Sequence, residues 1–309
     1  MPEPILAFTR VSKRFADGTV ALAGVDLRVA PGEFVSVVGP SGCGKSTLLR
    51  IASGLSEASE GTVTVRTDKP GYVFQDPTLL PWRTVQANVE LFAELRGLPK
   101  EERRRRAEEA IELVGLSDFA RHRPRALSGG MRMRASLARS LTLAPELFLF
   151  DEPFGALDEI TRERLNDELL QLFLARRFAA LFVTHSVTEA VYMSTRVVVM
   201  SGRPGQVLGD FAVPFDYPRS SQLRFDEPFA HLAGQVSARL RGTSRTTGGG
   251  SGGLKSEATA QVAGGHAEPS GSPPVNQGSG GLKSAAGTQA AGGHATPSGS
   301  PPVDKAVHR

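Results

Sequence analysis

The chain has 309 residues and a net charge of +4, and 40% of its residues are hydrophobic. This composition provides a core for one large domain or two small ones. Nucleic-acid binding is not indicated, because no basic stripe carries interleaved aromatic residues. No apolar run reaches the roughly 18 residues that a membrane-spanning helix needs.

The opening sequence MPEPILAFTR has neither the charged start nor the apolar centre of a signal peptide, so we expect the chain to stay where it is made. The single cysteine, Cys43, rules out an internal disulfide and is typical of a reducing cytosol. A redox role for Cys43 is a minor alternative, because in a glycine-rich loop its backbone N–H group matters more than its thiol.

Residues 1–241 alternate short apolar runs with amphipathic stretches, which is the pattern of a parallel sheet with crossover helices. The run EFVSVVG predicts a buried strand, and STLLRIASGL predicts a helix. Between them, GPSGCGKST has the spacing G-x-x-x-x-G-K-[ST] in the strand–loop–helix context that a phosphate-binding loop requires. The alternative is a plain glycine turn before a helix, and the strand before it and Lys-Ser-Thr within it argue against that alternative.

This phosphate loop predicts a binding site for nucleotide phosphates. Its glycines allow successive N–H groups to point at phosphate oxygens, and the following helix adds its positive end. Lys45 is expected to reach the β- and γ-phosphates, and the Ser46 hydroxyl to ligate Mg²⁺. The predicted loop residues are Gly39, Pro40, Ser41, Gly42, Cys43, Gly44, Lys45, Ser46 and Thr47.

A further candidate for the phosphate site is a single polar residue after a short apolar run. Gln75 follows a short β-rich run in YVFQDP, and its amide could bridge Mg²⁺ and an attacking water. Further along, KEERRRRAEEAIELVGL predicts a helix in which acids flank Arg103–Arg106 at helical spacing. A solvated helix face is favoured there over a partner-binding patch.

A second glycine turn begins LSGGMRMRASLARSL, directly before another predicted helix. Ser128, Gly129 and Gly130 form a candidate anion site with a positive helix end and with no acid or base. Such a turn can bind phosphate but cannot hydrolyse it alone.

The apolar run ELFLFDEP places Asp151 and Glu152 at the carboxyl end of a predicted strand, where open α/β sheets bind their ligands. Buried acids are costly unless they hold a metal or a proton. Asp151 is the expected Mg²⁺ partner, directly or through water, and Glu152 is placed to polarise the attacking water. The alternative is a pair of turn acids. RFAALFVTH ends in His185 at the same predicted edge, within reach of a γ-phosphate, although a structural role is equally compatible with this histidine alone.

The motifs together resemble the nucleotide-binding subunit of an ATP-binding cassette (ABC) transporter over about residues 5–240. The resemblance implies an α/β P-loop NTPase with a RecA-like core and a mainly parallel sheet. It also implies a small antiparallel β subdomain and an inserted α-helical subdomain at about residues 76–145. The implied activity is ATP hydrolysis, with ATP and Mg²⁺ as cofactors.

The resemblance also assigns residues. Phe15 matches the aromatic residue that stacks on adenine, and Gln75, Ser46 and Asp151 match the Mg²⁺ ligands. The matching catalytic set is Glu152 as general base, His185 as the switch histidine and Gln75. Asp158 matches the loop that follows the acids, and Met131 stands where the family often has glutamine.

In this family, the turn of Ser128, Gly129 and Gly130 contacts the γ-phosphate held by a partner chain. A single copy of each motif therefore implies a homodimer or pairing with a homologous ATPase subunit. Transmembrane permease subunits and, indirectly, a substrate-binding protein are further implied partners, at the cytoplasmic face of the membrane. Leu80 and Trp82 are expected to contact a partner, although Trp82 could instead pack within its own chain.

The stretches VFQDPTLLPWRTVQANV and MSGRPGQV resemble importers of nitrate, sulfonate, taurine and bicarbonate. One alternative is an ABC subunit for another small cargo. Another alternative is a soluble ABC ATPase acting on ribosomes or DNA. Such a protein usually has two cassettes or a coiled-coil insertion, and this sequence indicates neither. A regulatory protein with an inactive cassette is opposed by the filled catalytic positions.

Composition changes after Arg241. Residues 242–309 are rich in Gly, Ser, Pro and Ala, and we expect them to be disordered because they cannot bury enough apolar surface. They contain a tandem repeat, at 250–275 and 278–303. His266 and His294 recur once per repeat, but without neighbouring ligands they do not predict a metal site.

Overall fold

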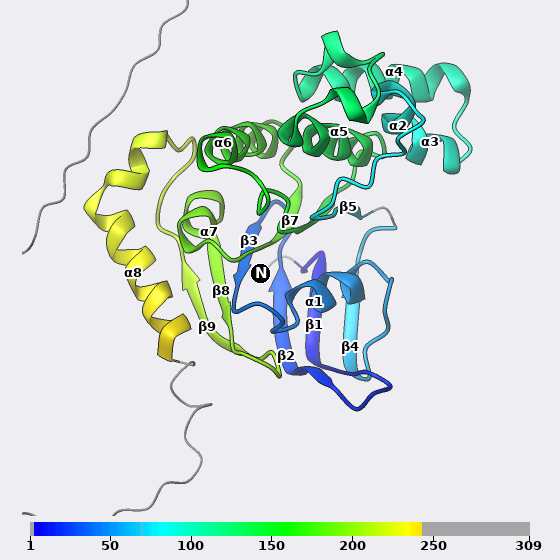
Figure 1. The fold of residues 1–309 in the computed structure, drawn as a ribbon. Helices are drawn as coiled ribbons and strands as arrows, with labels where there is room; N and C mark the ends of the chain where they lie inside the picture. Colours follow the sequence, from blue (N-terminus) through cyan, green and yellow to red (C-terminus); the bar gives the residue numbers. More distant parts are fainter. Residues whose placement is uncertain (1–2, 69, 243–309) are drawn as a thin grey trace, which may run out of the picture. The chain divides into compact units, whose positions relative to one another are not determined.

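The computed structural model describes residues 3–68 and 70–242 (Figure 1). The predicted tail, with its repeats and with His266 and His294, lies outside the described residues except for Gly242.

The described residues form a six-stranded central sheet in the order β5-β6-β7-β3-β8-β9. The pairings from β5 to β8 are parallel, and β9 runs antiparallel to β8. This sheet confirms the mainly parallel core that the alternating pattern predicts. The strands are β3 (Phe34–Val38), β5 (Gly71–Val73), β6 (Leu147–Asp151), β7 (Ala179–Thr184), β8 (Arg196–Met200) and β9 (Val207–Ala212).

A second sheet of three antiparallel strands has the order β2-β1-β4, which confirms the small β subdomain. Its strands are β1 (Leu6–Arg14), β2 (Val20–Val29) and β4 (Glu60–Val65). Helix α1 (Lys45–Ala52) contributes Leu48 and Leu49 to the apolar core that also joins this sheet to Val35 and Val37 of β3.

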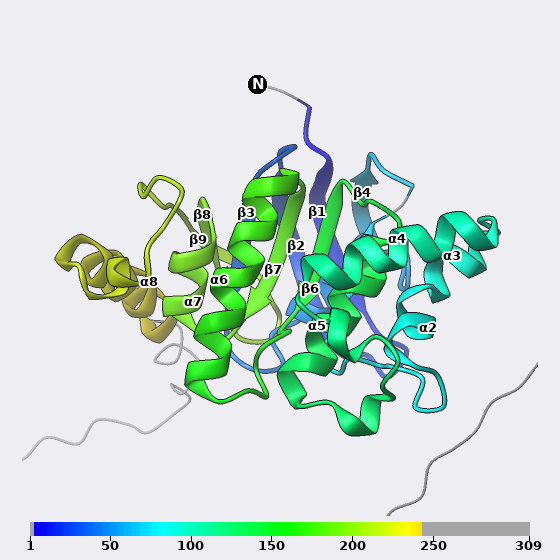
Figure 2. The ribbon, with the colours of Figure 1, turned by 90° about the horizontal axis from the view of Figure 1, so that it is seen from above.

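The other face of the central sheet is covered by helices. Phe34 and Val38 of β3 point to this face, and their alternation with Val35 and Val37 is the period-two pattern of a buried strand. Figure 2 shows α6 and α5 in front of the sheet and the antiparallel strands behind it. The helices that contribute buried residues to this core include α5 (Gly129–Leu141), α6 (Glu159–Arg176), α7 (Val187–Met193) and α8 (Glu227–Gly242).

The chain between β5 and β6 is mostly helical, which confirms the inserted helical subdomain of the predicted fold. Short turns of 3₁₀ helix, Ser117–Phe119 and Pro124–Ala126, precede α5, and a third, Ser221–Phe225, precedes α8. The other helices of the insertion are α2 (Val85–Val89), α3 (Leu91–Leu95) and α4 (Lys100–Leu113).

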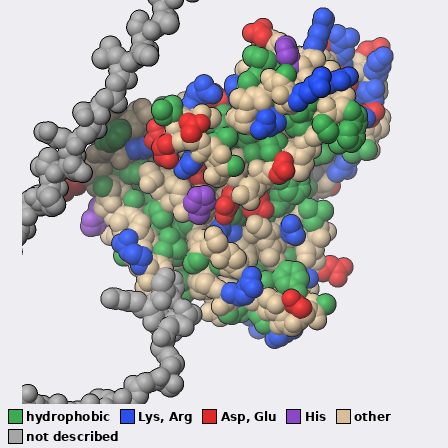
Figure 3. Space-filling model, in the orientation of Figure 1, with side chains coloured by type: hydrophobic (Ala, Val, Ile, Leu, Met, Phe, Trp, Pro, Cys, Tyr) green, Lys and Arg blue, Asp and Glu red, His purple; other side chains and the backbone are tan. Residues whose placement is uncertain are grey.

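Helix α4 carries the predicted basic run, and basic side chains gather over this region in Figure 3. Arg104 and Arg105 are exposed and pair with acids on the same helix, as predicted for a solvated face. Arg103 and Arg106 also turn toward neighbouring segments: Arg103 lies 3.7 Å from Glu90, and Arg106 donates to the carbonyl of Thr142. Arg106 keeps an ion pair with Glu102 at 2.7 Å as well, so three of the four arginines pair within the helix. No helix in the described ranges combines the length and the apolar character needed to span a membrane.

Candidate active site

The candidate site lies at the carboxyl ends of three neighbouring strands. β7 pairs with β6 on one side and with β3 on the other, so the segments that follow these strands meet at one edge of the sheet. The phosphate loop follows β3, Glu152 follows β6, and His185 follows β7. The topology thus brings together residues that are more than a hundred positions apart in the sequence.

The phosphate loop requires its glycines for steric reasons. Gly44 has a φ angle of 100°, and a Cβ atom on it would lie 2.7 Å from Leu22 and 2.8 Å from the carbonyl oxygen of Ala21. A Cβ on Gly39 would lie 2.8 Å from the sulfur of Cys43. Cys43 itself is buried, and burial raises the pKa of its thiol, which disfavours the reactive thiolate.

Lys45 begins α1 and is only 4% exposed. Its ammonium donates to the carbonyl oxygens of Gly39 at 2.9 Å and Pro40 at 3.1 Å. Its Nζ also lies 3.5 Å from Oε1 of Glu152. A buried cation is thus held inside the loop by two carbonyl dipoles and one carboxylate.

The residues around Asp151 fit a hard divalent cation. Ser46 donates its hydroxyl proton to Oδ1 of Asp151 at 2.8 Å, and the Tyr72 hydroxyl donates to Oδ2 at 3.2 Å. A hydroxyl and a carboxylate oxygen in contact are the ligand types that Mg²⁺ takes from proteins. The described residues contain no cluster of three or more His, Cys, Asp or Glu around a common point.

Burial raises the pKa of Asp151, and the hydrogen bonds from Ser46 and Tyr72 oppose that shift because they favour the ionised carboxylate. The Tyr72 ring stacks on Phe74 at 4.0 Å between ring centroids. Burial and the neighbouring Asp151 charge raise the pKa of the Tyr72 hydroxyl, which therefore stays a donor. Sequence reasoning missed Tyr72, although a hydroxyl in an otherwise apolar strand three residues before Gln75 was an available signal.

Glu152 lies between Lys45 and His185. Its Oε2 is 3.2 Å from Nδ1 of His185, and its backbone N–H donates to the carbonyl of Val183 at 2.9 Å. Glu152 has a φ angle of 45°, a strained conformation for a residue with a side chain. The hydrogen bond to Val183 and the pairing of β6 with β7 hold the backbone in this strained conformation, and so place the carboxylate at the sheet edge.

The other predicted residues lie on separate elements. Ser128 caps α5 by accepting from the N–H of Met131 at 3.3 Å, and Asp158 caps α6 by accepting from the N–H of Thr161 at 3.0 Å. Gln75 is exposed, and Phe15 is 44% exposed. Among the described residues, no hydrogen bond or ion pair joins any of these four to the phosphate loop. The side chains next to Gly129 and Gly130 are those of Leu157, Thr161 and Leu165, near the start of α6.

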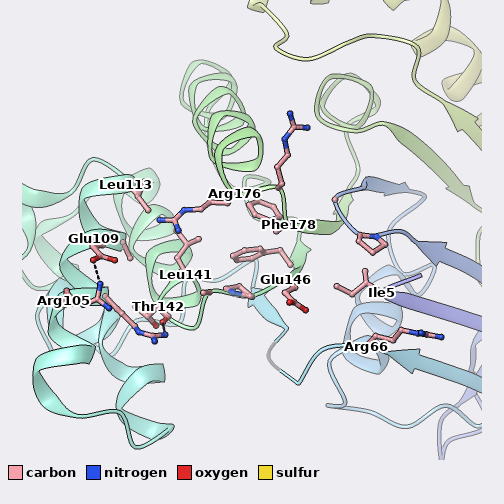
Figure 4. Close-up of a pocket in the computed structure, with 18 of the residues that line it drawn as sticks. Ile5, Arg66, Arg105, Glu109, Leu113, Leu141, Thr142, Glu146, Arg176 and Phe178 are labelled. Carbon is pink, nitrogen blue, oxygen red and sulfur yellow. Dashed lines mark hydrogen bonds and ion pairs between the residues drawn. The ribbon is translucent and has the colours of Figure 1, made fainter. Parts of the chain in front are cut away.

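A cavity of about 830 Å³ lies away from this site, at the amino ends of the same strands (Figure 4). Its lining includes Arg105, Arg176, Glu109, Glu146 and Phe178, so it carries both charge signs. This cavity is therefore not the candidate phosphate site, which is defined by the glycine loop at the opposite ends of the strands.

A parallel sheet with a glycine loop, a buried lysine and a hydroxyl–carboxylate pair at its carboxyl edge defines a P-loop nucleoside triphosphatase. Residues 22–155 match the family model described as ABC transporter. The chain is 44% identical over 242 residues to an ATP-binding protein of Brucella abortus (strain 2308), covering 76% of this chain and 92% of that protein. It is also 44% identical over 243 residues to the aliphatic sulfonates import ATP-binding protein SsuB 1 of Pseudomonas syringae pv. syringae (strain B728a), covering 78% of this chain and 98% of that protein.

A solved structure described as a dimeric structure of MJ0796, a bacterial ABC transporter cassette, is also similar. Its TM-score is 0.61 at 34% identity, over 68% of this chain and 100% of that one. The same cassette is known in a dimeric post-hydrolysis state with ADP and Pi. The chain belongs to the ABC transporter family, as an ATP-binding subunit with ATPase activity.

Tyr72→Phe should move the acidic limb of the pH–activity profile to higher pH. The change removes a hydrogen bond that favours ionised Asp151, so the pKa of this carboxyl rises further and the carboxylate is lost earlier as the pH falls. The measurement is kcat/KM for MgATP against pH. Tyr217→Phe is the matched control, because the Tyr217 hydroxyl donates to the carbonyl of Met193, away from the site. An unmoved acidic limb in Tyr72→Phe would contradict this role for Tyr72.

Proposed function

We propose that this subunit powers a membrane importer for a small anion such as nitrate, sulfonate or taurine. The observation that carries the hydrolytic part is the position of Glu152, whose carboxylate lies between the Lys45 ammonium and the His185 ring at the edge where the phosphate loop opens. Only a group at this edge can act on a phosphate held by the loop.

In the proposed mechanism, the loop 39–47 wraps the phosphates of ATP with the backbone N–H groups of its residues other than Pro40, and Phe15 stacks on the adenine. Lys45 exchanges its contact with Glu152 for the β- and γ-phosphates, which frees the carboxylate to orient and deprotonate water. His185 contacts the γ-phosphate from the neighbouring strand end.

Magnesium would be held by the Ser46 hydroxyl and Asp151, with Gln75 as a further oxygen ligand. When bound, Mg²⁺ neutralises the charge that develops on the phosphates. The hydrogen bonds from Ser46 and Tyr72 to Asp151 support the assignment of Ser46 and Asp151.

Glu152→Gln should keep ATP binding and lose turnover by about 10² to 10⁴, the range for removing a general base. Lys45→Ala should weaken both binding and turnover, since it removes the cation nearest the phosphates. Nucleotide affinity and phosphate release, measured side by side, separate the two effects. Near-normal turnover in Glu152→Gln would exclude the general-base role.

The chain is proposed to work as a dimer in which each site uses both subunits. Ser128, Gly129 and Gly130 begin α5, on the sheet face opposite α1. Helix starts with free N–H groups bind anions, and the turn contains no acid or base. The similar cassette of known structure is dimeric, which supports a second copy, or a homologous subunit, as the source of the missing contact.

Two forced dimers test this sharing, each carrying one Lys45→Ala and one Ser128→Arg change. With the changes on opposite chains, a shared-site dimer has one site damaged twice and one intact, so roughly half the activity should remain in the simplest count. With both changes on one chain, each site is damaged once and activity should vanish. The ATPase rates of the two dimers decide the matter, and activity in only the second dimer would refute sharing.

The proposed permease contact uses the segment that carries Leu80 and Trp82. The Trp82 side chain is 67% exposed, so its own chain does not bury it, whereas soluble proteins bury most of such a large apolar surface. A sulfonate import subunit among the relatives supports a small-anion cargo. These points also support a position at the cytoplasmic face of a membrane, attached through permease subunits and served indirectly by a substrate-binding protein.

Trp82→Glu should release the subunit from its permease while leaving the ATPase activity of the isolated chain within about twofold, because a surface substitution away from the site does not alter the chemistry. Co-purification with a polytopic membrane protein measures the first effect. Leu95→Glu is the control, since Leu95 is 74% exposed at the end of α3, outside the turn that carries Trp82. A soluble complex that contains no membrane protein would favour a non-transport ATPase, and uptake of labelled anions would identify the cargo.

A further inference from the structure

The segment 77–84 connects Gln75, which precedes it, to the exposed Trp82 within it. Two side chains that are almost fully buried hold this segment: Arg139 is 3% exposed and Asn88 is 0% exposed. Asn88 fixes the second half, because its side chain accepts from the N–H of Leu80 and donates to carbonyl oxygens of the segment. Arg139 reaches the first half from α5.

The guanidinium of Arg139 is bonded to two consecutive residues. Its Nη1 donates to the carbonyl of Thr78 at 3.0 Å, and its Nη2 donates to the carbonyl of Pro77 at 2.9 Å and to the Thr78 hydroxyl at 3.0 Å. Thr78 has a φ angle of 47°, which is costly for a β-branched residue. The fork of Arg139, together with Asp76, whose carboxylate accepts from the Thr78 N–H at 3.0 Å, therefore holds this strained conformation three residues after Gln75.

The charge of Arg139 has no carboxylate partner within 4.0 Å among the described residues. The ring of Phe92 lies 5.0 Å from its Cζ, and its Nε is buried without a hydrogen-bond partner. Burial without a counter-ion lowers the pKa of this guanidinium, because desolvation disfavours the charged form. A buried charge with this cost indicates that the directional donors, rather than the packing of the stem, are what the position requires.

We propose that Arg139 is a positioning residue for ATP hydrolysis, which fastens Pro77 and Thr78 to α5 and so fixes Gln75 relative to the helix that begins beside Ser128. Ten residues separate Gly129 from Arg139, or about 15 Å of continuous helix. Through this helix, a displacement of the phosphate-binding turn moves the Gln75 loop and the segment around Trp82 together. The proposal rests on the proposed role of Gln75.

Arg139→Met tests this fastening in the full chain, because methionine keeps an apolar stem and removes the donors. We expect kcat to fall between about tenfold and about a hundredfold, as for a misplaced catalytic group, with KM for MgATP changed less than about twofold. Trp82 is the single tryptophan of the chain, so its fluorescence reports this segment alone. Its anisotropy should fall and its quenching by acrylamide should rise.

Arg134→Met is the matched control. Arg134 lies on the same helix, donates to the carbonyl of Val114 at 3.1 Å, lies 3.8 Å from Glu168 and also has a buried Nε without a hydrogen-bond partner. Its loss should lower stability in a similar way and leave kcat and Trp82 within about twofold of the unmodified protein. Equal losses of kcat in both variants would mean that Arg139 is only structural, and would overturn the proposal.

Thr78→Gly covers the case in which Arg139→Met does not fold, since Thr78 is exposed and glycine accepts its φ angle. This change removes the hydroxyl and frees the backbone. It should lower kcat and the fluorescence anisotropy of Trp82, and leave the melting temperature unchanged. Unchanged kcat and unchanged Trp82 anisotropy in Thr78→Gly would overturn the proposal.

A Gln75→Ala background separates this proposal from the role of Gln75 itself. If Arg139 acts through Gln75, adding Arg139→Met to Gln75→Ala should lower kcat by less than about twofold more. A full second loss would show that Arg139 acts by another route and would overturn the proposal. If Gln75→Ala alone has normal turnover, the role of Gln75 fails. Trp82 anisotropy then still shows whether Arg139 holds the segment, but hydrolysis would no longer depend on that hold.

Discussion

The parallel pairing of β6, β7 and β3 is the constraint on which the site depends. In this register Val38 is paired with Thr184, and Asp151 with Val183, so the three strands end together. A shift of one residue would turn Asp151 to the other face of the sheet, because successive side chains of a strand alternate. The distances between Lys45, Glu152 and Asp151 therefore follow from the hydrogen bonds of buried strands whose own side chains are apolar.

Charges at this edge are held by partners rather than by solvent. Lys45 is compensated by two carbonyl oxygens and Glu152, and Asp151 by two hydroxyl donors. In partly buried surroundings the interaction within each pair is stronger than it would be in water. Removing one partner leaves the charge of the other without compensation. This arrangement fixes the positions of Lys45, Glu152 and Asp151 at the sheet edge.

The His185 loop is held by a similar device. The Thr184 hydroxyl donates to the carboxylate of Glu189 and accepts from the N–H of Ser186. Burial raises the pKa of Glu189, which lies on α7 and is 7% exposed. Thr184 and Glu189 thus hold the strand end next to His185, as Arg139 holds the chain next to Gln75. In both places a buried polar side chain, outside the family motifs, fixes the backbone beside a proposed functional residue.

The sequence by itself determined the α/β class of fold and the glycine loop, and it predicted acids at a strand end. The strands at EFVSVVG, ELFLFDEP and RFAALFVTH, and the helix after GPSGCGKST, follow from apolar patterning and glycine placement, which are local properties. The order in which the strands pair, and hence which strand ends are neighbours, came from the structure. Local patterning does not encode pairing order, because strands far apart in the chain satisfy the same burial requirement in several orders.

Only the tertiary structure decided the contacts between distant side chains. Tyr72 meets Asp151 across 79 positions, and Arg139 meets Thr78 across 61. The turn of Arg103 and Arg106 toward neighbouring segments was equally invisible in the charge pattern of their helix, which reports the spacing of charges but not what packs beside them. Each of these contacts stabilises a buried polar group by pairing it with a particular partner. The two groups become neighbours only when the chain has packed, so a local pattern in the sequence cannot indicate the pair.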